Sequence, residues 1–147
     1  MGGAVLLRLG ALIAVSLLVW LAVAGVRAYA AARKRKVLSA APATIVTESA
    51  GADRVKILAF SSEDCSPCHR LQKPALRRLL DARGEHVMVV DIDAPSSPEL
   101  TRQYAVLTVP TTVVLDAEGR ARAVNYGFAP LDKLLRQVDD VLMTPVA

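Results

Sequence analysis

The chain has 147 residues, of which 53% are apolar, so it has room for one domain with a stable core. Its formal charge of +4 is unevenly distributed: residues 1–36 carry six Lys and Arg and no acid, whereas residues 37–147 carry 12 bases and 14 acids. The part expected to fold is therefore slightly acidic. Because it also lacks an interleaved basic and aromatic pattern, the composition argues against nucleic-acid binding.

The first informative segment is an uncharged apolar run of 18 residues, 9–26. As a helix it spans roughly 27 Å, close to the hydrocarbon thickness of a bilayer, and this length predicts a transmembrane helix. Trp20 and Tyr29 can act as interfacial anchors. A cleaved signal peptide is the alternative, because 22–24 and 28–30 have the small-x-small pattern of cleavage sites. The length of the run and the basic residues after it favour an uncleaved anchor.

The charges that flank this span predict its orientation. Residues 1–8 form a short N-terminal flank, and 27–44 form a basic flank and linker. Five Lys and Arg follow the span, whereas only Arg8 and the amino terminus precede it. The positive-inside rule then predicts a single-pass membrane protein with its soluble domain in the cytoplasm. An extracytoplasmic orientation stays open, since this rule describes a bias.

After the linker, strand-like and helix-like patterns alternate. The order strand, helix, strand, helix, strand, strand, helix predicts that the first two long strands are parallel and the last two form a hairpin. The sheet is then mixed and flanked by helices, and residues 144–147 form a tail. The predicted elements are a short edge strand 44–47, strand 55–60, helix 67–82, strand 87–91, helix 95–104, strand 111–115, a turn at 116–119, strand 121–126 and a final helix from Pro130.

Two of the predicted helices are amphipathic. In helix 67–82, Pro74 should kink the helix or end its first part, because proline cannot donate the backbone hydrogen bond. Spacing of three and four residues defines one apolar face on each helix. The predicted apolar positions are Leu71, Ala75, Leu76, Leu79 and Leu80 in the first helix, and Leu131, Leu134, Leu135, Val138, Val141 and Leu142 in the last.

The chemistry-bearing motif is Cys65-Ser66-Pro67-Cys68-His69, which contains the two cysteines of the chain. It lies between a predicted strand and a predicted helix, so Cys65 is expected near a helix N-terminus. Unpaired N–H groups and the helix dipole there favour a thiolate. The spacing brings the second sulfur over the first after one turn. The motif therefore indicates a dithiol/disulfide exchange site.

Three alternative interpretations of the motif remain open. A structural disulfide over such a short loop stabilises little. Covalent haem attachment also uses Cys-x-x-Cys-His, with Met88 or Met143 as candidate second axial ligands. Zinc needs two further ligands, and His69 and His86 are the two histidines available. No metal ligand set is predicted.

Together these features resemble the thioredoxin family over residues 45–143. The resemblance rests on the strand before Cys65-Ser66-Pro67-Cys68, on Val109-Pro110-Thr111 before the third long strand, on the 116–119 turn, and on Gly127 ahead of the last helix. It implies an α/β thioredoxin-like fold with a mixed sheet of four to five strands, here with an N-terminal transmembrane helix.

The resemblance also implies roles for individual residues. Cys65 corresponds to the exposed nucleophile and Cys68 to the buried resolving cysteine. Val109 and a cis Pro110 correspond to the ledge that faces the cysteines and pairs with the substrate chain. Ser66 and Pro67, between the cysteines, are also expected to contact substrate.

Some positions depart from the family pattern. Asp64 stands where a tryptophan is usual, and a carboxylate beside Cys65 should oppose thiolate formation. Ala59 stands where a buried aspartate is usual. Glu63, Asp64 and His69 are then the candidates for modulating the pKa of the cysteine thiols. These departures suggest a dedicated partner.

The predicted function is that of a membrane-tethered thiol–disulfide oxidoreductase with no cofactor beyond the Cys65–Cys68 pair. Its expected partners are protein disulfide substrates and a thiol reductant or membrane redox partner. The alternative is a thioredoxin-like binding module whose cysteines form a redox switch.

Overall fold

A computed structural model of the chain describes residues 2–39 and 54–144. They divide into two compact units, with the boundary after Arg35. The short edge strand predicted at 44–47 lies outside the described residues.

The first unit belongs to one long helix, α1 (Gly2–Leu38). Within it, Arg8–Leu38 is long and apolar enough to cross a membrane, and none of its most apolar stretch is buried. A signal sequence has the same properties. The helix contains the predicted span 9–26 and continues through 27–38, which we expected to be flank and linker.

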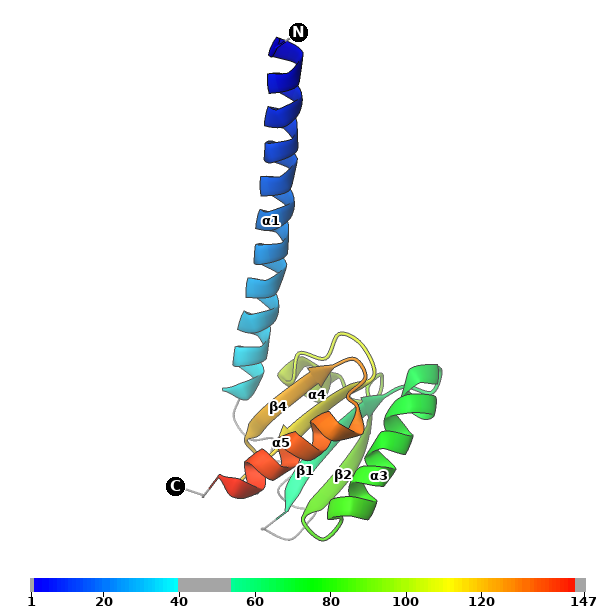
Figure 1. Cartoon of the computed structure of the whole chain (residues 1–147). Coiled ribbons are helices and arrows are strands. Elements are labelled where there is room, and N and C mark those ends of the chain that lie inside the picture. Colours follow the sequence, from blue (N-terminus) through cyan, green and yellow to red (C-terminus); the bar gives the residue numbers. More distant parts are fainter. Residues whose placement is uncertain (1, 40–53, 145–147) are drawn as a thin grey trace. The chain divides into compact units, whose positions relative to one another are not determined.

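The second unit is built on a sheet in the order β2-β1-β3-β4 (Figure 1). β1 pairs in parallel with β2 and antiparallel with β3, which pairs antiparallel with β4. The predicted mixed sheet and element order are therefore confirmed. The strands are β1 (Val55–Ser61), β2 (Val87–Asp93), β3 (Thr111–Leu115) and β4 (Ala121–Tyr126).

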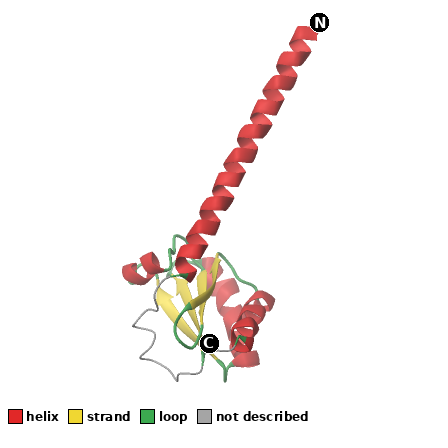
Figure 2. Cartoon of the chain, turned by 90° about the vertical axis from the view of Figure 1, so that its left-hand side faces the viewer, coloured by secondary structure: helices red, strands yellow, loops and turns green. Residues whose placement is uncertain are grey.

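Helices lie on both sides of this sheet (Figure 2). One face of the sheet packs against α3 (Lys73–Arg83) and α5 (Leu131–Met143), through residues that include Ile57, Leu79 and Leu134. The other face packs against Leu100, which lies in α4 (Pro98–Gln103), and against Tyr104, which directly follows this helix. Because strand residues alternate between faces, Leu58 and Phe60 belong to this second cluster.

The helix that follows the cysteines differs from its prediction. It begins at Ser66, passes through a π-helical turn, η1 (Cys68–Gln72), and continues as α3. The Lys73 N–H donates to the Cys68 carbonyl, and Pro74 follows directly. Pro74 has no N–H and its ring crowds the preceding turn, so the wider turn is accommodated at this point. The irregularity predicted at Pro74 is thus present, as a π-turn before it.

The predicted apolar face of this helix was partly wrong. Leu71 is 49% exposed and Leu80 is 37% exposed, whereas Gln72 is 3% exposed. The π-turn changes the rotation of the chain relative to α3, and it turns Gln72 rather than Leu71 toward the core. In α5, Leu142 was also expected in the apolar stripe, but it is 41% exposed near the helix end.

The helix predicted at 95–104 is shorter, because its first residues form a turn. Asp93 at the end of β2 accepts hydrogen bonds from the backbone N–H and hydroxyl of Ser96. Such side-chain to backbone bonds favour a turn over a helix. The helix therefore begins at Pro98, a residue suited to a first turn.

Candidate functional site

The cysteine pair lies at the carboxyl end of β1, where the chain turns into the helix. Cys65 and Cys68 form a disulfide with their Cα atoms 5.3 Å apart. The Cys65 N–H donates to the Ser62 carbonyl at 3.2 Å, and this bond closes the turn after the strand. The Cys68 N–H donates to the Cys65 carbonyl at 3.1 Å, which fixes the first helical turn around both sulfurs.

The two sulfurs differ in their surroundings. Cys65 is 8% exposed and Cys68 is 2% exposed, so both residues are buried and Cys65 is the more accessible. The Cys68 N–H also lies 3.2 Å from the Cys65 Sγ atom and donates to it. After reduction, an N–H at this position can stabilise a negative charge on Cys65 sulfur. This backbone hydrogen bond acts on the Cys65 sulfur.

The three residues expected to influence the thiols are all exposed. The structure brings two of them together, since the His69 Nε2 atom lies 2.9 Å from the Glu63 backbone carbonyl. A carbonyl only accepts, so Nε2 carries the proton in this contact. The Glu63 and Asp64 side chains make no hydrogen bond with the described part of the chain.

Pro110 is brought to the same end of the sheet by strand pairing. Thr111 pairs with Phe60 across β3 and β1, so Pro110 lies beside the end of β1, a few residues before Cys65. The Val109–Pro110 peptide bond is cis, and Pro110 is buried. The Pro110 carbonyl accepts from the Gly127 N–H at 2.9 Å, and Gly127 has a φ of +87°, which favours glycine.

Gln72 is a site residue that the sequence reasoning missed. Its side chain lies against the backbone of Ala129: its amide nitrogen donates to the carbonyl at 3.2 Å, and its oxygen accepts from the N–H at 2.9 Å. These two bonds connect the helix after the cysteines to the loop before α5. No sequence signal marked it, because Gln72 stands among the polar and charged residues of a helix predicted to be amphipathic.

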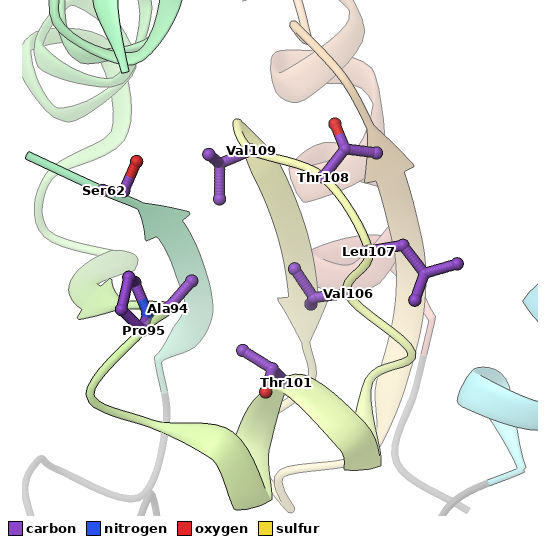
Figure 3. Close-up of a pocket in the computed structure, with 8 residues that line it drawn as sticks. All are labelled: Ser62, Ala94, Pro95, Thr101, Val106, Leu107, Thr108 and Val109. Carbon is purple, nitrogen blue, oxygen red and sulfur yellow. The ribbon is translucent and has the colours of Figure 1, made fainter. Parts of the chain in front are cut away.

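An open pocket of about 330 Å³ lies beside the loop that carries Val109. Figure 3 shows Val109 reaching toward Ser62, at the end of β1, across this pocket. Its lining holds no charged side chain, so it offers an aliphatic surface with hydroxyl groups at its edge. The lining residues are Ser62, Ala94, Pro95, Thr101, Val106, Leu107, Thr108 and Val109.

The residues named as alternative ligands are scattered. Met88 lies in β2, and Met143 ends α5 with 76% of its surface exposed. Within residues 2–39 and 54–144, no three His, Cys, Asp or Glu side chains are grouped so that they can hold a metal ion.

Comparison with known proteins agrees with this fold. The model of the thioredoxin-like domain family matches residues 42–142, so the chain belongs to that family. Thioredoxin of Alicyclobacillus acidocaldarius is 29% identical over 61% of this chain and 84% of its own length. Thioredoxin of Chlamydia trachomatis is 32% identical over 56% of this chain and 78% of its own.

Solved structures show the same fold. A mutant thioredoxin from Halobacterium salinarum superposes with a TM-score of 0.60 over 71% of this chain and 88% of its own, at 21% identity. The germline-specific thioredoxin Deadhead of Drosophila gives a TM-score of 0.55 over 66% and 86%, at 26% identity. With the close cysteine pair, these relatives identify the chain as a thiol–disulfide oxidoreductase of the thioredoxin-like family.

Proposed function

We propose that this chain is a membrane-tethered oxidoreductase that reduces or exchanges protein disulfides, with Cys65 as the attacking thiol and Cys68 as the resolving thiol. The observation that carries this proposal is the asymmetry of the pair. Cys65 is the more accessible cysteine and its sulfur receives the Cys68 N–H, whereas Cys68 is 2% exposed within the helix.

The reaction balances in two exchanges. The Cys65 thiolate attacks one sulfur of a substrate disulfide, and the other substrate sulfur leaves as a thiolate and takes a proton. The Cys68 thiol then loses its proton and attacks Cys65, which forms the Cys65–Cys68 disulfide and releases the second substrate thiol. Two electrons pass from the protein to the substrate. A thiol reductant or a membrane redox partner must reduce the pair again.

Substrate contact is assigned to the residues around the pair. Ser66 and Pro67 are exposed at the start of the helix, and Val109 is half-buried beside the pocket. An extended substrate chain can pair with the Val109 backbone and place an aliphatic side chain in the uncharged pocket. Asp64, Glu63 and His69 are assigned to tuning the reactivity of the thiols, because all three lie exposed beside the pair.

Membrane attachment is assigned to α1. The stretch Arg8–Leu38 is long and apolar enough for a span, and the five bases after residue 26 favour a cytoplasmic domain under the positive-inside rule. An oxidising, extracytoplasmic role is the outcome if the orientation is reversed.

Turnover in a protein-disulfide reduction assay tests the function. Full-length protein in nonionic detergent, recycled by dithiothreitol, should accelerate the reduction of insulin, and Cys65→Ser should abolish the acceleration. If the wild type shows no turnover but still binds a partner differently in its oxidised and reduced states, the protein is a redox-switched binding module instead.

Membrane-impermeant thiol labelling of intact cells tests the attachment and the orientation. Cys65 should stay unlabelled until the membrane is permeabilised, and the protein should remain in the membrane fraction after carbonate washing. Labelling in intact cells would reverse the orientation, and a soluble protein with a new N-terminus after the apolar run would identify a signal sequence.

A further inference from the structure

The helix that carries the cysteines is the positively charged part of an otherwise acidic domain. Residues 54–147 contain 12 bases and 12 acids, but 66–83 contain five bases and one acid, Asp81. The remainder of 54–147 therefore carries seven bases and 11 acids. The positive charge is concentrated directly after the disulfide.

Four of these bases have no counter-ion within the described part of the chain. Arg83 pairs with Asp139 of α5 at 3.0 Å, whereas no acid of the described residues lies within ion-pair distance of the other four. Elsewhere, Arg120 pairs with Asp116 and Arg136 with Asp132. We name these four residues the basic helix face: Arg70, Lys73, Arg77 and Arg78.

This arrangement does not serve the stability of the helix. Lys73 and Arg77 are four residues apart, a spacing at which like charges repel. A destabilising charge pattern beside a reactive disulfide points to a role in binding.

The basic helix face borders a groove between α3 and β2, which lie next to each other (Figure 1). The groove has a volume of about 290 Å³ and is lined by aliphatic side chains together with Lys73 and Arg77. Asp91 also lines it and is the one acid there among the described residues. The lining residues are Lys73, Leu76, Arg77, Leu80, Val89 and Asp91.

We propose that the basic helix face and this groove form a docking surface for an acidic protein segment that flanks the partner's disulfide. The proposal rests on the proposed exchange function and names its partner class. From Cys68 to Arg77 the helix rises about 14 Å, so a partner whose disulfide is at Cys65 extends along this surface. Its carboxylates meet cations that form no ion pair with an acid of the described residues, and this attraction accelerates association at low ionic strength.

The test compares two disulfide-bonded peptides that differ only in flanking residues, which are Glu in one and Gln in the other. Reduced full-length protein in nonionic detergent is oxidised by each peptide, and the second-order rate constants are measured by stopped flow. The Glu peptide should react about tenfold faster than the Gln peptide in low salt. The ratio should approach one in about 1 M salt, where the Debye length is about 3 Å.

Two charge reversals locate the effect. Arg77→Glu should abolish or invert the preference for the Glu peptide, and Arg77→Gln should reduce it by an intermediate amount. Arg122→Glu is the matched control, because Arg122 is exposed on β4 and forms no ion pair with the described residues. It changes the net charge equally and should leave the ratio at the wild-type value.

Each outcome has a defined meaning. Equal rate constants for the two peptides in low salt would overturn the docking surface while leaving the exchange function intact. Reduction of neither peptide would instead contradict the exchange function. Binding of the basic helix face to anionic phospholipid vesicles, abolished by Arg77→Glu and without any peptide preference, would assign the surface to lipid and overturn the proposal.

Discussion

The two faces of the sheet are held together in different ways. On the face covered by α3 and α5, buried polar groups are paired: Gln72 with the Ala129 backbone, and Asn125 with both Thr112 and Gln137. The opposite face is mainly an apolar cluster, with Lys56 and Thr111 also buried on that side, and the Tyr104 hydroxyl is buried there without a partner in the described part of the chain.

This difference explains how the disulfide is positioned. Apolar contacts stabilise a fold without directional preference, whereas a pair of hydrogen bonds fixes one helix relative to one loop. The cysteine-bearing helix and the loop before α5 are linked by such bonds. We therefore expect the apolar face to determine overall stability and the polar face to determine the local geometry of the site.

The largest effect should come from the apolar face. Leu58 is fully buried in that cluster, and Leu58→Ala should lower the free energy of unfolding by about 2–5 kcal/mol through lost burial and a cavity. Denaturant unfolding measures this loss. Hydrogen exchange should accelerate throughout the domain, and acceleration confined to the region around the cysteines would contradict the assignment of this face to global stability.

Gln72→Met should have a smaller and more local effect. Methionine has a similar volume but cannot bond to the backbone of Ala129, so a buried N–H and carbonyl lose their partners. The expected loss is about 1–3 kcal/mol. The Ala129 amide should exchange with solvent faster than amides in β3. Uniform acceleration would show that the two bonds do not hold the loop locally.

A change at Asp64 should alter reactivity without altering the fold. Asp64 is exposed, and its side chain forms no hydrogen bond with the described residues. Asp64→Asn removes a negative charge next to Cys65, so the reduced protein should be alkylated at Cys65 about fivefold faster at neutral pH. An unchanged or slower rate would mean that the carboxylate does not act on Cys65 in this way.

Tyr104→Phe should give the smallest change. Removal of an unpaired buried hydroxyl should leave the free energy of unfolding at neutral pH within about 1 kcal/mol of the wild type or slightly higher. A loss greater than this would show that the hydroxyl has a partner. Calorimetry or denaturant unfolding decides between these outcomes.

The same variant has a pH signature. Burial raises the pKa of Tyr104, so the folded protein holds this proton more tightly than the unfolded chain. The contribution of this proton to the free energy of unfolding is complete below the pKa of tyrosine in the unfolded chain, about 10. It is lost as the pH rises through the pKa of Tyr104 in the folded protein. Tyr104→Phe should therefore show a shallower decline in stability above about pH 10.

The order of elements was predictable because each strand and helix has a clear local pattern. The π-turn was not predictable from sequence, because an insertion of one residue into a helix leaves the spacing of the apolar residues almost unchanged. In the structure this turn buries Gln72 and exposes Leu71. The turn before α4 depends on the two hydrogen bonds that Asp93 accepts from Ser96, and these compete with helix formation.

The cysteine motif was likewise recognisable from sequence, but the pocket beside it and the pairing of the nearby charges were not. The pocket beside Val109 joins the ends of β1 and β2 to α4 and the loop after it, which are distant in sequence. The four bases of the basic helix face stand out only after the structure shows that other bases, such as Arg83 and Arg120, form ion pairs. Such features depend on tertiary contacts rather than on local pattern.

The most direct test of the central claim is to trap the mixed disulfide. Cys68→Ser protein is incubated with a disulfide-bonded peptide, and the covalent product is mapped by mass spectrometry beside Cys65→Ser protein. Our account predicts a stable adduct on Cys65 in the first variant and none in the second. An adduct on Cys68 that forms as readily in the Cys65→Ser protein would contradict the assigned roles of the two cysteines.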